Sequence, residues 1–452
     1  MIPPKNSQHQ IKIEDVTAMG FGVGNINGFT IFADGGLPGD EVRVQILKTK
    51  PRYAYGKIIE ILNYSPLRIS SPCPASGKCG GCQFQHCAYP AQLEIKKRLV
   101  TGALERIGGV ESPNVPDVLG MEKPMGYRNK ATFPIAPAGD GFAIGMYAAR
   151  SHRITEVEHC IIQHPAHVKV LEVMRRHIKA HKISAYNETT HTGLMRHIMI
   201  RTSLATREVM VVLVINGDNI PGEQELCEGL TQIGATTVVA NINNSRGNTI
   251  LGSRCNVLCG TGFIRERLGH VEYQLSAPSF FQVNPVQAKV LYDIALNHAR
   301  LTGSETIIDA HAGVGGIALY VASRAKKVIG MDISQSAITD AQKNAALNGI
   351  ENATFICGTA EDVIPGLLSA HDSQSPPVIF LDPPRKGCEP ELLNAIVASA
   401  VEKIVYISCD PATLARDVKI LATGGYRLAV AQPVDMFPMT GKVEVAALLQ
   451  RG

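Results

Sequence analysis

The sequence predicts a multidomain protein with a small N-terminal β-barrel, an α+β middle domain and a C-terminal doubly wound α/β domain. The chain has 452 residues, and about 150 residues make a typical domain. Residues 10–66 alternate short apolar segments with glycine-containing turns, whereas the chain from about residue 270 alternates short apolar strands with helices. The second pattern is typical of a parallel sheet covered by helices.

The composition excludes a disordered or fibrous chain. Hydrophobic residues make up 45% of the chain and charged residues 19%, as in globular proteins. No apolar run approaches the roughly 18 residues of a membrane helix, and residues 1–16 lack the apolar core of a secretory signal. We therefore expect a cytoplasmic protein with no membrane partner, and a monomer. The net charge of +4 is too small to predict a nucleic-acid partner by itself.

Residues 1–66 are assigned to the barrel. Short strand-like segments with turns between them have the spacing of a small barrel; the segments are residues 30–33, 41–46 and 56–61. Cations and aromatic rings then occur together, at Lys48, Lys50, Arg52, Tyr53, Tyr55 and Lys57. This mixture suits contact with RNA phosphates and stacking on RNA bases. A solvated hairpin would have the same composition.

Residues 67–268 are assigned to the middle domain, which begins with a dense cysteine segment. Cys73, Cys79 and Cys82 have C-x5-C-x2-C spacing, and Cys87 and Cys160 are two candidates for a fourth ligand. Four thiolates hold an iron–sulfur cluster or a zinc ion. Cysteines in a glycine-containing loop rarely serve packing alone, so the segment predicts a metal site.

Residues 269–452 are assigned to the α/β domain, and its first strand leads into a glycine-rich turn at 311–316. Such a turn lets a ligand approach the backbone, although glycines can also serve packing alone. Asp332 ends the next strand, where acids usually bind ribose hydroxyls. Because GxGxxG spacing and a Walker lysine are absent, S-adenosylmethionine is favoured over NAD or ATP. Residues 371–377 are expected to be a polar loop.

Two further loops follow strands of this domain at the same edge of the sheet. Asp382 lies in a stiff Asp-Pro-Pro-Arg loop, and Cys409 precedes a predicted helix at 412–423. The helix dipole favours a thiolate, so we expect Cys409 to be ionised. Glu444 starts the last, antiparallel strand, where burial should raise its pKa toward that of a general base. A thiolate, a base and a methyl donor together suit uracil chemistry, since addition at C6 makes C5 nucleophilic.

The chain resembles the 23S rRNA (uracil-C5)-methyltransferases, RNA m5U methyltransferases with a TRAM domain. Nearly the whole chain takes part in the resemblance. It is carried by SFFQVNP at 279–285, the segment around Asp382, SCDPATLARD at 408–417 and FPMTGKVE at 437–444. It implies a TRAM barrel with an OB-like fold, and a Rossmann-like class I methyltransferase domain. The implied activity is S-adenosylmethionine-dependent methylation of C5 of one uridine in 23S rRNA, through a covalent cysteine–C6 adduct.

The resemblance also implies a role for individual residues. The implied nucleophile is Cys409 and the implied base is Glu444. The implied donor pocket consists of Gln282, His311, Gly316, Asp332, Thr359 and Asp382. The implied [4Fe-4S] cluster is bound by Cys73, Cys79, Cys82 and Cys160, which selects Cys160 over Cys87 as the fourth ligand.

Two other functions are compatible with the sequence. The same chemistry on a tRNA uridine, or on another rRNA uridine, would need the same residues. A non-catalytic RNA-binding protein that keeps the fold is the second alternative, because His311 and Lys442 stand where the family usually has other residues. Amino methylation of DNA is disfavoured, since Arg385 replaces the aromatic residue of a DPPY-like loop.

Overall fold

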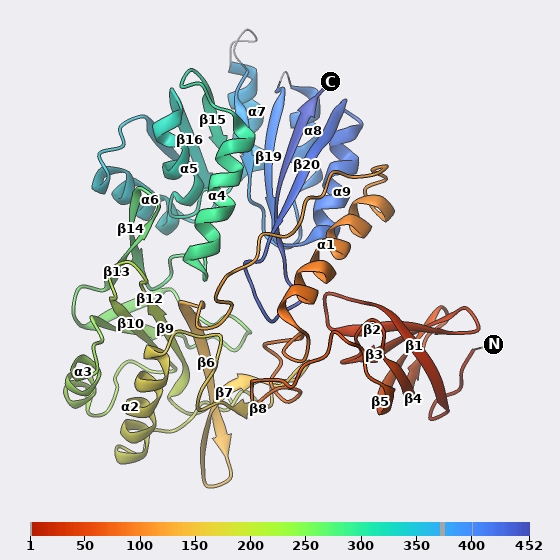
Figure 1. Cartoon of the computed structure of the whole chain (residues 1–452). Helices are drawn as coiled ribbons and strands as arrows, with labels where there is room; N and C mark the ends of the chain where they lie inside the picture. The colour runs from red at the N-terminus through yellow and green to blue at the C-terminus, as the bar shows by residue number, and fades with distance from the viewer. Residues whose placement is uncertain (1, 371–375, 400) are drawn as a thin grey trace.

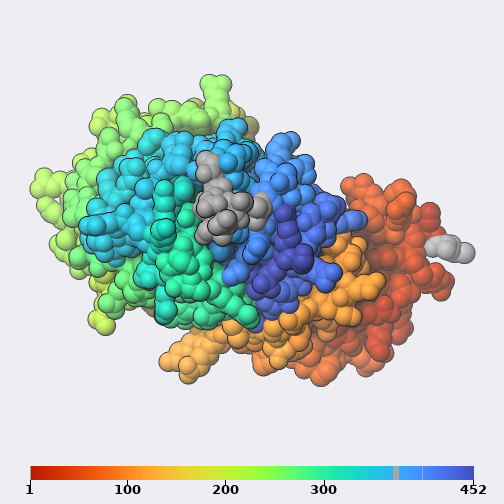
Figure 2. Space-filling view, turned by 90° about the horizontal axis from the view of Figure 1, so that it is seen from above, coloured from red at the N-terminus to blue at the C-terminus, as the bar shows by residue number. Residues whose placement is uncertain are grey.

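The computed structural model describes residues 2–370, 376–399 and 401–452. Residues 371–375 of the predicted polar loop lie outside the described residues. The chain forms a barrel, a mixed middle sheet and a C-terminal α/β sheet, in the predicted order (Figure 1). In the space-filling view, an orange segment that follows the barrel lies between the red barrel and the blue C-terminal domain (Figure 2). No helix of the described residues is long and apolar enough to cross a membrane.

The N-terminal barrel is closed, in the strand order β1-β2-β3-β5-β4. Its strands are β1 (Gln8–Val16), β2 (Phe21–Ile26), β3 (Phe29–Asp34), β4 (Glu41–Thr49) and β5 (Tyr53–Asn63). Alternate apolar side chains, such as Ile13, Ile31 and Val44, fill the interior and are fully buried. Closure pairs β1 with β4, so the barrel has no free strand edge.

The middle sheet has seven strands in the order β12-β11-β10-β9-β6-β7-β8. They are β6 (Lys130–Ala138), β7 (Gly141–Tyr147), β8 (Ile154–Glu156), β9 (Met195–Thr202), β10 (Val209–Ile215), β11 (Thr237–Ile242) and β12 (Arg254–Cys259). Helices α2 (Ala166–Ala180) and α3 (Glu223–Gln232) pack with it in one apolar core. The pairing is antiparallel except between β10 and β11, as expected of an α+β domain.

The C-terminal sheet is parallel in β15–β19 and antiparallel at its end, in the order β17-β16-β15-β18-β19-β21-β20. Its strands are β15 (Thr306–Asp309), β16 (Lys327–Asp332), β17 (Ala353–Cys357), β18 (Val378–Leu381), β19 (Lys403–Ser408), β20 (Tyr426–Val434) and β21 (Glu444–Arg451). One core contains α4 (Pro285–Ala299), α5 (Gly316–Val321) and α6 (Gln335–Leu347). A second core contains α7 (Ala360–Ala370), α8 (Pro390–Ala398) and α9 (Pro411–Ala422). Two helical layers thus enclose the sheet.

Two elements connect the middle of the chain to the C-terminal sheet. Helix α1 (Tyr89–Arg106) shares an apolar core with α9. The hairpin of β13 (Phe263–Leu268) and β14 (Val271–Ser276) spans the predicted boundary at residue 268. Its backbone donates hydrogen bonds to the side chains of Asn344 in α6 and of Asn348, which follows α6, each at 2.8 Å. The domain limits 1–66, 67–268 and 269–452 stay predictions.

Candidate active site

The carboxyl ends of four parallel strands bring the predicted site residues to one edge of the C-terminal sheet. Asp309, Asp332 and Cys409 end or follow β15, β16 and β19, and Asp382 follows β18. Ser408 pairs with Val445 across β19 and β21. The next residues outward along this antiparallel pair are Cys409 and Glu444, which therefore face each other at the sheet edge.

The Cys409 thiol lies among acids. Burial, Glu444 and Asp382 raise its pKa to about 11, and only the nearby Arg385 acts in the opposite direction. This direction is opposite to the one expected from the helix dipole. Asp410 contributes to the difference, since its carboxylate caps α9 by accepting hydrogen bonds from the backbone N–H of Ala412 (2.9 Å) and Thr413 (3.4 Å). The helix N-terminus acts on this carboxylate instead of acting on the thiol.

Glu444 is buried, with 4% of its surface exposed. Burial and the charge of Asp382 raise its pKa well above the usual value, while Arg385 and Lys442 act against this. The predicted direction of the shift is confirmed. Because the charges of Glu444 and Cys409 disfavour each other, the two groups share one negative charge more readily than they carry two.

Two acids hold the glycine-rich turn in place. Asp309 accepts hydrogen bonds from the backbone N–H of His311 (3.3 Å) and Ala318 (2.9 Å). Asp332 accepts from the N–H of Gly313 (3.1 Å) and from that of Ser334 (2.8 Å). The turn passes through the left-handed region at Gly315, with φ of 87°, where a side chain would strain the backbone. The glycine is thus required by the turn itself.

Two carboxyl groups at this edge are poised to ionise near neutral pH. Burial and the charge of Asp332 raise the pKa of Asp309 to about 7. Burial and the charge of Asp309 raise the pKa of Asp382 to about 7 as well. A bound cation would favour the ionised form of both groups. S-adenosylmethionine carries a sulfonium and an ammonium group, so this edge suits it electrostatically.

The remaining predicted donor-site residues surround the same edge. Thr359 donates a hydrogen bond to Asp362 (2.8 Å), and the N–H of Gly358 donates to the backbone carbonyl of Asp332 (3.0 Å). His311 has a buried Nδ1 with no hydrogen-bond partner among the described residues. Gln282 is buried, with 8% of its surface exposed. The structure thus brings all the predicted residues of this region to one edge.

Sequence analysis missed three residues of this site. The position of Asp309 in the sequence could have identified it, since it ends the first parallel strand, where ligand-binding acids are found. Tyr292 gave no such signal, yet it contacts the side chain of Gln282 and lies close enough to Asp382 and Glu444 for their charges to raise its pKa. Ile333 follows Asp332 and is 74% exposed. This exposed apolar surface beside an acid fits a ligand that carries both a flat ring and hydroxyl groups.

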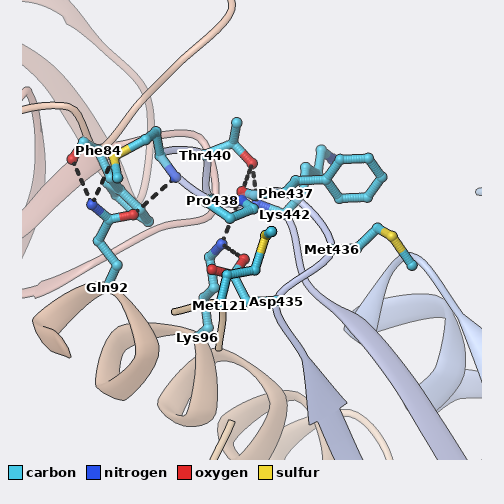
Figure 3. A network of polar contacts seen from close by, with 12 residues as sticks. Phe84, Gln92, Lys96, Met121, Asp435, Met436, Phe437, Pro438, Thr440 and Lys442 are labelled. Atoms are coloured by element: carbon cyan, nitrogen blue, oxygen red, sulfur yellow. Dashed lines mark hydrogen bonds and ion pairs between the residues drawn. The ribbon is translucent and has the colours of Figure 1, made fainter. Parts of the chain in front are cut away.

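The loop that leads to Glu444 is fixed from outside the C-terminal domain (Figure 3). Lys96 of α1 forms an ion pair with Asp435, and both side chains are fully buried. The Nζ of Lys96 also donates a hydrogen bond to the carbonyl of Phe437 (3.0 Å). The hydroxyl of Tyr89 donates a hydrogen bond to the carboxylate of Asp435 (2.8 Å). Gln92, also in α1, accepts from the N–H of Met439 (3.0 Å). We refer to residues 435–443 as the base loop.

The barrel and the cysteine segment also contact the base loop. The N–H of Phe84 donates to the carbonyl of Met439 at 2.9 Å. A Cβ at Gly441 would lie 2.0 Å from the carbonyl oxygen of Ala18, in the turn between β1 and β2. Only glycine allows this approach. Met439 packs against Tyr127, so the base loop meets three separate segments of the chain.

The predicted cysteine ligands lie together beside the base loop. Cys82 and Cys160 pack against the cluster of Tyr127, Ile162 and Met439. The charges of Cys73 and Cys79 act on both of them. Within the described part of the chain, no three His, Cys, Asp or Glu side chains stand at metal-ligand spacing. The four thiols thus lie near one another but not at ligand spacing, and the iron–sulfur cluster stays a prediction.

Cys87, the competing fourth ligand, lies elsewhere. It is fully buried in a separate apolar cluster with Val16, Leu37 and Phe84. This environment explains it as a packing residue.

The aromatic residues predicted on the barrel form a ring cluster. Tyr53, Tyr55, Phe21 and Phe32 have ring centroids between 5.4 and 5.7 Å apart. The guanidinium of Arg150, from the turn after β7, lies 4.9 Å from the ring centroid of Phe21. Rings and a cation at this spacing form a surface on which bases can stack.

Comparison with known proteins identifies the family. Residues 88–452 match the family described as tRNA (Uracil-5-)-methyltransferase, and residues 6–59 match the TRAM domain. The chain belongs to this methyltransferase family. An RNA methyltransferase described as uncharacterized, from Clostridium acetobutylicum, is 44% identical over 99% of this chain and 98% of its own length. One from Halalkalibacterium halodurans is 42% identical over 99% of this chain and 97% of its own length.

A solved structure extends the likeness to the whole fold. The tRNA (uracil-54, C5)-methyltransferase of Pyrococcus abyssi, in complex with S-adenosyl-L-homocysteine, is 28% identical to this chain. Its TM-score is 0.78, and the match covers 98% of this chain and 100% of the other. The protein is thus an S-adenosylmethionine-dependent RNA methyltransferase, with a TRAM barrel at its N-terminus and the methyltransferase fold at its C-terminus.

The raised pKa of Asp382 predicts that donor binding depends on pH. Asp382 is ionised above about pH 7 and neutral below it, so affinity for the cationic donor should fall as the pH drops through 7. We expect about tenfold weaker binding of S-adenosylmethionine at about pH 6 than at about pH 8 by calorimetry. Asp382→Asn is the control. This variant lacks the Asp382 carboxyl group, so any pH dependence that remains comes from the donor and from the other titrating groups. Equal pH dependence in the two proteins would contradict the prediction.

The buried ion pair predicts an asymmetric response to mutation. Lys96→Met leaves Asp435 buried without its cation, which should lower the free energy of unfolding by about 3–5 kcal/mol. The double variant Lys96→Met/Asp435→Leu removes both charges and should recover most of this loss. Urea unfolding followed by circular dichroism measures both changes. A double variant as unstable as Lys96→Met would show that the charges are not the cause.

Proposed function

We propose that this enzyme methylates C5 of a specific uridine in 23S rRNA, with Cys409 as covalent nucleophile and Glu444 as general base. The observation that carries the proposal is the register of β19 and β21, in which Ser408 pairs with Val445. Cys409, one residue beyond β19, and Glu444, the first residue of β21, come next along this pair. Asp382 lies near both, since its charge raises the pKa of each. A nucleophile, a base and an acidic donor site therefore share one sheet edge.

The proposed chemistry uses these groups in a fixed order. The Cys409 thiol first loses its proton to solvent, and the resulting thiolate adds to C6 of uracil. This addition makes C5 a nucleophile, and C5 then takes the methyl group. Glu444 accepts the proton from C5, and the C6–S bond breaks to return the thiolate. S-adenosylmethionine, when bound, supplies the methyl group. Glu444 must be ionised at the last step, and Asp382, Arg385 and Lys442 set how readily it is.

We assign the donor pocket to the residues at the ends of β15 to β18 and to the segment before α4. They are Gln282, His311, Gly316, Asp332, Thr359 and Asp382. The fit rests on two observations, the raised pKa of Asp382 and the buried Nδ1 of His311, which has no partner among the described residues. The first favours a cation and the second a hydrogen-bonding ligand.

We further propose that Cys73, Cys79, Cys82 and Cys160 bind a [4Fe-4S] cluster. Four thiols suit iron–sulfur or zinc, and the sequence resemblance selects iron–sulfur. Cys82 and Cys160 pack against the cluster that contains Met439, so the proposed iron–sulfur cluster would lie beside the base loop. Its role would be to hold that loop, since the cysteines pack beside the loop and not beside Cys409. The cytoplasmic location and the monomeric state stay predictions.

A tRNA uridine is the second candidate substrate. The solved enzyme named for uracil-54 of tRNA matches this chain over almost its whole length, whereas the assignment to 23S rRNA rests on the sequence resemblance. Mapping 5-methyluridine by mass spectrometry in rRNA and tRNA, from a deletion strain and its parent, separates the two. Loss of the modification from tRNA alone would overturn the rRNA proposal.

The assigned roles predict opposite outcomes for two variants. Cys409→Ala should form no covalent RNA adduct and no product. Glu444→Gln should add to the RNA and transfer the methyl group, and then stall because the C5 proton stays in place. The stalled species should survive a denaturing gel and carry label from methyl-labelled donor. Turnover by Cys409→Ala, or wild-type product release by Glu444→Gln, would refute the roles.

The cluster proposal predicts a difference between neighbouring cysteines. Anaerobically purified protein should contain iron and acid-labile sulfide and absorb broadly at about 400 nm. Cys73→Ser should lose both elements, while Cys87→Ser should retain them because Cys87 lies in a separate apolar cluster. Stoichiometric zinc without sulfide in the wild type would refute the iron–sulfur assignment.

A further inference from the structure

The middle domain contains a cavity of about 220 Å³. Its walls come from the end of β6, the β7–β8 hairpin, the segment at 186–188 and the start of β9. The lining side chains that matter for its chemistry are Tyr147, His152, Tyr186, Glu188, Arg196 and His197. None of them belongs to the methyl-transfer site or to the cysteine group. The cavity is smaller than the roughly 300 Å³ at which pockets for drug-sized ligands begin, so it suits a single small ring system.

Flat groups form part of the cavity wall. The guanidinium of Arg196 lies 4.2 Å from the ring centroid of Tyr186, and both residues are 5% exposed. The rings of Tyr147 and His152 lie 5.2 Å apart. Proteins recognise unpaired RNA bases by stacking them on such rings and guanidinium planes.

Several polar atoms in the cavity wall have hydrogen-bonding positions that no described residue occupies. Glu188 accepts hydrogen bonds from the hydroxyl of Tyr147 (3.2 Å) and from His152 (2.8 Å). A carboxylate has about four acceptor positions, so two remain. Among the described residues, no partner exists for the buried Nε of Arg196 or the buried Nδ1 of His197. Buried polar atoms normally have partners, so these two atoms are available to hydrogen-bond with a ligand in the cavity.

The charges suit a ligand with both donors and acceptors. Arg196 donates two hydrogen bonds of 2.7 Å, to the carbonyls of Asn243 and Ser245, so its position is fixed. Burial and the charge of Arg196 lower the pKa of His197 to about 4. A neutral imidazole can both donate and accept. The site thus combines an anionic acceptor with fixed donors, which matches the edge of a base that carries an amino group.

The same hairpin connects this cavity to the barrel. Arg150, in the turn between β7 and β8, lies over Phe21 of the ring cluster and forms an ion pair with Asp34 at 2.8 Å. Tyr147 and His152 lie on either side of that turn. An RNA strand that stacks on the ring cluster would therefore reach the cavity within a few nucleotides.

We propose that the cavity binds one unpaired nucleobase of the RNA substrate, turned out of its helix, and that it prefers bases with an exocyclic amino group over uracil. The amino group donates to Glu188, and the ring lies against the flat groups of the wall. The proposal rests on the activity on RNA and is independent of the roles assigned to Cys409 and Glu444. It gives the enzyme a second contact point that reads sequence at a nucleotide other than the methylated uridine.

Methyl NMR of the full-length protein tests the proposal directly. Ile135 and Ile154 line the cavity, and their ¹³C-labelled methyl groups, assigned through Ile→Val variants, report ring currents from a bound base. AMP, CMP, GMP and UMP are titrated at millimolar concentrations. We expect shifts of both methyl groups with at least one amino-bearing nucleotide, at about tenfold lower concentration than with UMP.

A matched pair of variants tests the acceptor. Glu188→Gln should reduce the preference over UMP by about tenfold, since the charged acceptor is lost. Asp140→Asn makes the same chemical change outside the cavity, on the turn between β6 and β7, and should leave the preference unchanged. Calorimetry with S-adenosylmethionine checks that both variants keep the fold of the donor site.

The outcomes separate this proposal from the proposed function. No shift at Ile135 and Ile154 with any nucleotide would overturn the cavity as a base site. Equal binding of UMP, or an unchanged preference in Glu188→Gln, would overturn the amino-group preference. These titrations involve no methyl transfer, so their failure leaves the mapping of 5-methyluridine unaffected, and the reverse also holds.

Discussion

The buried ion pair between Lys96 and Asp435 fixes the loop that leads to Glu444, the proposed base. Its partners are 339 positions apart in the chain, and the whole middle sheet is inserted between them. Burial lowers the pKa of Lys96, while the charge of Asp435 acts against this. Two buried charges are tolerated when hydrogen bonds saturate them, which the hydroxyl of Tyr89 and the carbonyl of Phe437 do here. The pair fastens α1 to the base loop, and Glu444 follows that loop directly.

Negative charge is the second constraint on the site. Asp309, Asp332, Asp382 and Glu444 meet a thiol at one sheet edge, and the pKa of several of these groups is raised by a neighbour. Each acid makes ionisation of the next one more costly. A cation bound among them reverses the sign of this interaction and lowers the pKa of Cys409 together with those of the acids. The ionisation of the Cys409 thiol would therefore depend on whether the proposed donor pocket holds a cation.

Strand ends made most of the site predictable from sequence. Asp332, Asp382 and Cys409 follow short apolar segments, and parallel strands place such positions at one edge. The ionisation state of Cys409 was not predictable, because it depends on Glu444 and on the capping of α9 by Asp410. Tyr292 and Lys96 gave no signal either, since a buried polar side chain in a helix has no local signature. Glu188 and Arg196 acquire a shared cavity only through the pairing of strands that are far apart in the chain.

The base loop is the place where the RNA-binding and chemical parts of the enzyme meet. Met439 adopts a left-handed backbone conformation, with φ of 68°, which costs a residue with a side chain about 1–2 kcal/mol. Such a conformation persists only when the surroundings determine it. Here the surroundings are Gln92 of α1, Phe84 of the cysteine segment and the turn at Ala18 of the barrel. The conformation of the loop before Glu444 therefore depends on docking of the barrel and of the cysteine segment, and a shift of either would move Glu444 away from Cys409.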